Sequence, residues 1–162
     1  MVSNIAVEKA ADTDYPIEEL LRQRWSPLAF SDRSVEPEKL GSLLEAARWS
    51  ASSFNEQPWR YMIATKDNSE EFDRLLSCLA EGNQEWAKNA SVLMLSVAKR
   101  TFTFNGVENR HAFHDVGAAG ANLSAEATAQ GLFVHQMAGF DVAKAKETYG
   151  IPEDYDPVAA IA

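Results

Sequence analysis

The chain has 162 residues, of which 46% are hydrophobic, so it is long enough to bury a core and does not have the composition of a disordered chain. Its 24 acidic and 15 basic residues give a net charge of -9, which excludes a basic face for a nucleic-acid or anionic-membrane partner. The single cysteine excludes an internal disulfide and no apolar run is long enough to span a bilayer, so we expect one cytoplasmic domain over residues 1–162.

Hydrophobic spacing predicts alternating helices and strands. Residues spaced three and four apart share one face of a helix, whereas alternating or continuous apolar runs are typical of strands. Residues 1–13 show neither pattern and are expected to be flexible. In chain order, the predicted elements are a helix over 16–24, a loop over 25–35, a helix over 37–51, a strand over 59–65, a helix over 68–81, a strand over 91–98, a helix over 108–130, a strand over 133–137, a helix over 141–150 and a strand over 158–162.

This order has no strict βαβ rhythm, which favours a mixed α+β sandwich over a doubly wound parallel fold. The chain also lacks the Gly-x-Gly-x-x-Gly turn of a Rossmann domain. Gly117 and Gly120 instead lie inside the predicted helix 108–130, where each costs roughly 1 kcal/mol relative to alanine. Glycines there indicate close approach of another element, either a partner subunit's helix at a dimer interface or a segment of the same chain.

The most unusual segment joins the predicted helix 37–51 to the strand 59–65. It reads Ser-Ser-Phe-Asn-Glu-Gln-Pro-Trp over residues 52–59. Its hydroxyls and carboxamides donate and accept hydrogen bonds without net charge, which suits a flat heteroaromatic ligand with polar edges. An ordinary capping turn also uses Ser, Asn and Pro, so composition alone leaves both interpretations open.

The pattern Ser-Ser-x-Asn-x-Gln-Pro-Trp after a helix resembles the signature of the FMN-dependent nitroreductase family. In that family the loop comes from one protomer of a dimer and touches the flavin held mainly by the other. By this resemblance Ala51, Ser52, Ser53 and Asn55 would reach the FMN of a partner subunit. Phe54 sits where the family often has a small or polar residue facing the substrate, so it would line the substrate pocket.

A second segment, Arg-Trp-Ser-Pro-Leu-Ala-Phe from residue 24, resembles the family's amino-terminal motif. The resemblance implies that Arg24, Trp25 and Ser26 help to hold the FMN phosphate and ribityl chain, and an arginine fork suits phosphate. Leu28 stands where the family usually has a cation near the pyrimidine edge of the flavin, and leucine cannot stabilise negative charge there. Without the resemblance, Arg24 is a solvated cation at a helix end.

Two further segments follow in the family's order. Asn83 resembles an Asn that hydrogen-bonds the isoalloxazine, and Trp86 stands where some members have Lys. Trp86 either walls the substrate pocket or belongs to the core. Met137, Ala138 and Gly139 precede a Phe at the family's Gly-Phe pair, where the backbone contacts the flavin and directs an amide at its N5. Small residues there let the ring come close.

No catalytic side chain is assigned, because the resemblance places hydride transfer at flavin N5, with the backbone of Ala138 and Gly139 nearby. Cys78 lies in a helical apolar pattern and is expected to be a buried structural thiol rather than a nucleophile. His111 and His114 have a spacing that can bind metal, but no third ligand is evident, so no metal site is expected.

The resemblance covers about residues 16–162. It implies a nitroreductase-like α+β fold: a mixed, mainly antiparallel central sheet flanked by helices, with the long central helix at a homodimer interface. It also implies an FMN oxidoreductase in which NAD(P)H gives up hydride and a nitroaromatic, quinone or activated alkene then accepts it by a ping-pong mechanism.

Family members continue past this point into a carboxy-terminal arm that brings basic residues to the FMN phosphate, and we expect this arm to be missing. Leu28 and Trp86 also replace cations. Because a charge-assisted hydrogen bond contributes roughly 1.5–3 kcal/mol, FMN binding would weaken. The alternative is therefore a flavin-binding or structural relative with little turnover.

Overall fold

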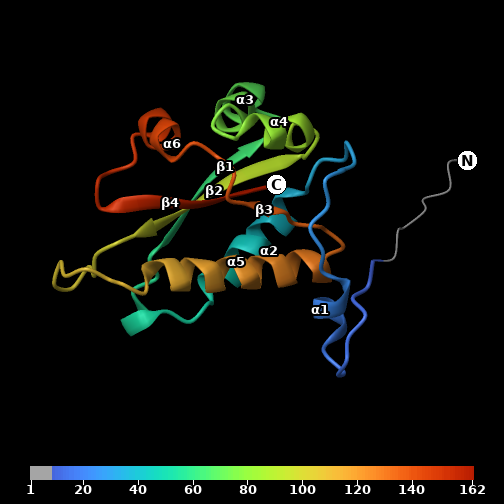
Figure 1. Ribbon diagram of the computed structural model, residues 1–162, viewed down its shortest axis with the longest axis horizontal. Coiled ribbons are helices and arrows are strands. Elements are labelled where there is room, and N and C mark those ends of the chain that lie inside the picture. The colour runs from blue at the N-terminus through green and yellow to red at the C-terminus, as the bar shows by residue number, and fades with distance from the viewer. Residues whose placement is uncertain (1–8) are drawn as a thin grey trace, which may run out of the picture.

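The computed structural model describes residues 9–162 (Figure 1). Its elements follow the predicted order, except for a 3-10 turn at Ser53–Asn55 and a helix at Glu81–Ala87 that were not predicted. The expected flexibility of residues 1–13 falls mostly on residues 1–8, which lie outside the described residues. The elements are α1 (Glu19–Gln23), α2 (Pro37–Arg48), the 3-10 turn η1 (Ser53–Asn55), β1 (Trp59–Thr65), α3 (Ser69–Leu76), α4 (Glu81–Ala87), β2 (Val92–Lys99), α5 (Ala112–Ala129), β3 (Gln136–Met137), α6 (Val142–Tyr149) and β4 (Tyr155–Ile161).

The four strands form one sheet in the order β1-β2-β4-β3, and each neighbouring pair is antiparallel. Helices α2 and α5 cover one face of this sheet, whereas α3, α4 and α6 lie on the other (Figure 1). The predicted α+β class with an antiparallel sheet between helices is therefore confirmed. Within residues 9–162, no helix has both the length and the apolar character needed to cross a bilayer.

Strand β2 is central and is covered on both faces, as its continuous apolar sequence predicts. Leu93, Leu95 and Val97 enter the core cluster beneath α3 and α6, while Met94 and Ala98 enter the cluster beneath α2 and α5. This split follows from the two-residue period of a strand. The sheet thus separates two cores, and the second core holds the long helix α5 in place.

The predicted helix 68–81 is too long, because α3 ends at Leu76, and the separate helix α4 that begins at Glu81 was not predicted. Its start is correct, since the Asn68 side chain accepts a hydrogen bond from the Glu71 amide at 3.3 Å. The interruption has a tertiary cause. Leu79 forms a β-bridge with Phe140, and the next amide, that of Ala80, donates to the Gly139 carbonyl.

Other element boundaries also differ from the prediction. Helix α2 ends at Arg48 rather than at residue 51, and strand β3 begins at Gln136 rather than at residue 133. Helix α1 begins after Glu18, whose backbone is extended, rather than at residue 16. Helix α5 begins at Ala112 rather than at residue 108, because Glu108 forms a β-bridge with Thr101. Strand β4 begins at Tyr155, three residues before the predicted start, because its pairing with β2 continues past a register shift.

The two glycines of α5 lie in different surroundings. Gly117 is exposed, and nothing lies within 4 Å of the position that a Cβ would take. Gly120 is buried, and a Cβ there would lie 3.0 Å from Oε1 of Gln136. The Gln136 amide donates to the Gly120 carbonyl and to the Ser124 hydroxyl, both at 3.1 Å. Gly120 therefore makes room for a side chain of the same protomer, while Gly117 leaves an open stretch of helix surface.

Two half-buried tyrosines, whose hydroxyl groups are buried, predict how stability changes at high pH. The hydroxyls of Tyr61 and Tyr149 have no hydrogen-bond partner among the described residues, and burial raises the pKa of each to about 12. Because this folded-state pKa exceeds the ordinary value of about 10, folding favours the neutral phenol. That contribution to stability is complete below about pH 10 and is lost as the pH rises toward 12.

We expect the double variant Tyr61→Phe, Tyr149→Phe to lose less stability than the wild type when urea unfolding is compared at about pH 8 and 11. At neutral pH its stability should be unchanged or higher by about 1 kcal/mol, because two unpaired buried hydroxyls are removed. Tyr15→Phe, at a side chain that is 80% exposed, is the matched control. Identical alkaline losses in all three proteins would contradict this prediction.

Candidate functional site

Three of the four predicted segments meet at one place. The imidazole Nδ1 of His135 lies 2.8 Å from the carbonyl oxygen of Pro27, which joins the segment 24–30 to the approach of β3. The Trp86 ring lies between the His135 ring, 4.6 Å away, and the Phe30 ring, 6.1 Å away. Trp86 is half-buried and packs against the core beneath α3 and α6, so it also serves as a core residue.

Asn83 and Gly139 form a second close contact between these segments. The Asn83 Nδ2 donates to the Gly139 carbonyl at 2.8 Å, and a Cβ at residue 139 would lie 2.5 Å from that nitrogen. Glycine is therefore required for this approach. Met137 is buried and pairs with Ala160 of β4, whereas Ala138 is exposed. Among residues 9–162, the amides of Ala138 and Gly139 donate to no protein acceptor.

The segment 24–28 presents polar and apolar groups to solvent. The Arg24 guanidinium lies 3.4 Å from the Ser26 hydroxyl, and Leu28 is 57% exposed. The Trp25 ring lies edge-on to Phe133 with centroids 5.7 Å apart. The ammonium group of Lys9 lies 4.5 Å from the centre of the Trp25 ring. The sequence did not predict this cation, because residues 1–13 lack the hydrophobic spacing of a helix or strand that would place Lys9 near the segment 24–28.

The loop between α2 and β1 has an unusual backbone. Phe54, Asn55 and Gln57 have φ values of 53°, 54° and 52°, a region that residues other than glycine seldom adopt. The Ser52 hydroxyl accepts a hydrogen bond from the Gln57 amide at 3.0 Å. The Ser53 amide donates to Oδ2 of Asp115 at 3.0 Å. A non-glycine backbone persists in this region only where its surroundings hold it there, and such residues cluster at functional sites.

Asp115 binds the Ser53 amide of this loop, and the sequence did not predict that contact. It lies in the first turn of α5 and is 3% exposed, where the helix dipole favours its negative charge. A signal was available, because Asp115 interrupts the stripe formed by Ala112, Val116 and Ala119, which are at most 1% exposed. A carboxylate on the buried face of a helix needs a partner from another element.

Aromatic side chains extend the loop surface. The Phe54 side chain is 81% exposed, and its ring centre lies 5.6 Å from that of Phe102 and 5.9 Å from that of Phe104. Glu56 ties the loop to the same turn, since its carboxylate accepts hydrogen bonds from the amide and the hydroxyl of Thr103. Burial opposes the charged form, but these hydrogen bonds and the nearby Lys99 lower the pKa of Glu56.

The two groups of candidate residues lie at opposite ends of α5. The loop 52–57 contacts the first turn of the helix, whereas the segment 24–30 passes beyond the far end (Figure 1). Within the described chain, no hydrogen bond or aromatic contact joins residues 51–55 to the other group. The structure therefore joins the three segments that carry Arg24, Trp25, Ser26, Leu28, Asn83, Trp86, Met137, Ala138 and Gly139. It separates these segments from the loop that carries Ala51, Ser52, Ser53, Phe54 and Asn55.

Other candidate residues take structural positions. Cys78 is 2% exposed with its Sγ 3.6 Å from the Arg74 carbonyl oxygen, which confirms a buried thiol. His111 and His114 are both exposed, and the Nδ1 of His114 lies 3.2 Å from Oδ1 of Asp115. No cluster of three or more metal-ligating side chains occurs among residues 9–162.

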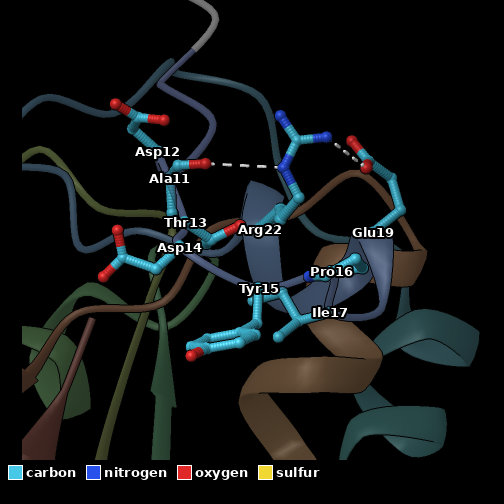
Figure 2. A pocket seen from close by; sticks show the side chains of 9 residues that line it. All are labelled: Ala11, Asp12, Thr13, Asp14, Tyr15, Pro16, Ile17, Glu19 and Arg22. Atoms are coloured by element: carbon cyan, nitrogen blue, oxygen red, sulfur yellow. Dashed lines mark hydrogen bonds and ion pairs between the residues drawn. The ribbon is translucent and has the colours of Figure 1, made fainter.

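A hollow of about 510 Å³ lies away from all these residues, between the amino-terminal segment and α1 (Figure 2). Residues 11–17, Glu19 and Arg22 line it. The Arg22 side chain closes one side by a hydrogen bond to the Ala11 carbonyl and an ion pair of 2.9 Å with Glu19. These contacts pair Arg22 with Glu19 and with the backbone, and none of the predicted site residues lines the hollow.

Comparisons with known proteins identify relatives along the chain. A model described as the Nitroreductase family matches residues 21–162. A crystal structure of an oxidoreductase containing FMN is 34% identical, with a TM-score of 0.88, and the match covers 93% of this chain and 77% of that one. A nitroreductase family protein from Clostridium difficile 630 is 24% identical, covers 88% and 79% of the two chains and has a TM-score of 0.73, which shows the fold alone.

A further relative is an uncharacterised 15.4 kDa protein of Mycolicibacterium smegmatis. It is 38% identical over 96 residues, which are 57% of this chain. The match spans 60% of that protein, less than two thirds of its length.

The contact between Asn83 and Gly139 can be tested by Gly139→Ala. We expect this change to reduce the free energy of unfolding by about 1–3 kcal/mol, because the new methyl group displaces the Asn83 amide from its carbonyl partner. Gly82→Ala is the matched control, since it lies beside Asn83 in α4 and a Cβ there meets nothing within 4 Å. Equal effects of the two variants in urea unfolding would contradict the assigned contact.

Proposed function

The chain belongs to the nitroreductase family, and on that premise we propose that it is an FMN-dependent oxidoreductase that uses NAD(P)H to reduce nitroaromatics, quinones or similar acceptors as a homodimer. The observation that carries the proposal is the division of the candidate residues between the two ends of α5. Neither group alone surrounds a flat ligand. A second copy of the chain that packs along α5 would supply the loop 52–57 to the segments 24–28, 83–86 and 137–139.

The groups present fit FMN. A flavin ring has carbonyl and ring nitrogen atoms along one edge and needs neutral donors and acceptors there. The unpaired amides of Ala138 and Gly139 are donors of this kind, and Oδ1 of Asn83 is an acceptor because its Nδ2 already binds Gly139. The phosphate needs cations, which Arg24 and Lys9 supply on the segment side.

FMN, when bound, supplies hydride chemistry that no side chain here can perform. The chain's own residues bind and orient. The Asn83–Gly139 hydrogen bond fixes the backbone on which the two free amides lie, and the small side chain of Ala138 leaves space above it. Phe54, exposed on the loop supplied by the partner subunit, would form an apolar wall for an aromatic acceptor.

Exposed apolar side chains support the dimer. Helix α1 has no buried residue, and its Leu20 and Leu21 are 41% and 53% exposed. On α5, Phe113 is 48% exposed, and the small residues Gly117 and Ala121 follow at intervals of four on the exposed side. Apolar and small residues on one helix face suit close packing against a second helix. A two-fold dimer would bury them on both copies.

The cofactor assignment predicts a visible spectrum. Purified protein mixed with FMN should show the oxidised-flavin band, and NADPH should bleach it under anaerobic conditions.

Leu28→Lys should tighten FMN binding by about tenfold, because a cation then faces the flavin. Val142→Lys, on α6 and 44% exposed, is the control for added charge.

Colourless protein that does not bind added FMN would contradict the proposal. Bound FMN that NADH and NADPH both fail to bleach would favour the alternative of a flavin-binding relative. Equal affinity in the two lysine variants would contradict the placement of Leu28 beside the flavin.

Assembly is tested by Ala121→Glu on the exposed face of α5. We expect light scattering to show a dimer for the wild type and a monomer for the variant, because the change puts a buried charge on both sides of the interface. FMN binding should fall with it, since each site would lose the partner's loop. Val142→Glu, away from α5, should stay dimeric. A wild-type monomer that turns over substrate would contradict the shared site.

A further inference from the structure

Asp115 is the one charged residue among the fully buried polar residues of the described chain, whose other members are Ser50, Ser96, Asn109 and Ser124. Within residues 9–162 no Lys or Arg pairs with it, and its one side-chain contact of this kind is with the imidazole of His114, which is 80% exposed. A buried carboxylate without a cationic partner is costly unless hydrogen bonds replace its lost water. An apolar residue would extend the buried stripe of α5 at lower cost, so packing does not explain this carboxylate.

What Asp115 does hold is the start of the loop. Its Oδ2 accepts the Ser53 amide across a sequence separation of 62 residues. The residues directly after Ser53 are Phe54 and Asn55, both with positive φ. A phenylalanine rarely adopts that conformation unless its neighbours hold it. Asp115 therefore fixes the chain at the point where it enters its strained turn.

A second anchor holds the other end of the turn. Glu56, whose side chain is 6% exposed, accepts hydrogen bonds from Thr103 and lies 3.6 Å from Lys99. The residues between the two anchors point outward, and Phe54 is 81% exposed. The carboxylates of Asp115 and Glu56 thus hold the two ends of a short turn whose residues Phe54 and Asn55 are exposed, which is the arrangement expected of a preorganised binding loop.

We propose that Asp115 is a positioning residue that holds the turn Ser53–Asn55 in the shape with which it enters the partner subunit's flavin site. The role of that shape in flavin binding rests on the proposed function, whereas the hydrogen bond between Asp115 and Ser53 does not. Asp115 acts through the Ser53 amide and touches neither flavin nor acceptor. Its loss therefore loosens the loop first and weakens FMN and acceptor binding as a consequence.

The experiment compares Asp115→Ala, Asp115→Asn and Asn122→Ala. Asparagine keeps an oxygen that can accept the Ser53 amide, so it is the rescue variant. Asn122 is the matched control, because its Nδ2 donates to Ser50 from the same helix without touching the turn. Hydrogen exchange at the Ser53 amide reports the loop directly. FMN dissociation constants, acceptor KM and kcat report the site.

In Asp115→Ala we expect Ser53 exchange to accelerate about tenfold or more, and the FMN dissociation constant and acceptor KM to rise by a similar factor, with a smaller change in kcat. Asp115→Asn should stay near the wild type, as should Asn122→Ala. Unchanged exchange and affinity in Asp115→Ala would overturn the proposal, as would equal losses in Asp115→Ala and Asp115→Asn.

A second variant covers the case in which Asp115→Ala does not fold, and the measurements distinguish failure of this proposal from failure of the proposed function. If Asp115→Ala does not fold, Ser53→Pro removes the donor instead, and Ser52 before it already has the extended backbone that a following proline needs. FMN affinity equal to wild type in Ser53→Pro would overturn the proposal. If exchange accelerates in Asp115→Ala but the wild type binds no FMN, the proposed function fails while the holding role of Asp115 stands.

Discussion

The burial of one face of α5 is the constraint on which the rest of the structure depends. Ala112, Ala119, Leu123 and Ala127 are 0% exposed along this face. Three of these four side chains are methyl groups, which lets α5 lie close to the sheet and to α2. Their burial fixes the rotation of the helix about its axis. Once this rotation is fixed, the side of the helix on which every other side chain of α5 lies is fixed too.

That rotation determines both halves of the candidate site. It turns Asp115 inward at the first turn, where the residue meets the loop, and it turns Gly120 and Ser124 toward Gln136. It leaves Gly117 facing outward. A single helix thus positions the loop at one end, β3 near the other and an open face between them. Under the proposed function, that open face lies where a second copy must pack for the two halves to meet.

Local signals predicted the elements, and contacts between distant residues decided what those signals could not. The strand 59–65, the proline start of α2 and the Asn68 cap depend on neighbouring residues and were confirmed. The break between α3 and α4 depends on Phe140, 61 positions after Leu79, so no local period reveals it. The Ser53–Asp115 hydrogen bond spans a similar distance. The family motifs name the segments proposed to bind FMN, but not the buried carboxylate that contacts one of them.

The turn Ser53–Asn55 places a phenylalanine, Phe54, at a positive φ. Asn tolerates positive φ, and glycine would tolerate it without cost, but Phe54 has φ 53° and gains little from its own protomer. Among residues 9–162 its ring pairs with the rings of Phe102 and Phe104, and the side chain stays 81% exposed. If the chain needed only the turn, glycine would serve better there. Packing within the described protomer therefore does not explain a phenylalanine in this conformation. Under the proposed function, the loop would enter a partner's flavin site, where the ring would face an aromatic acceptor.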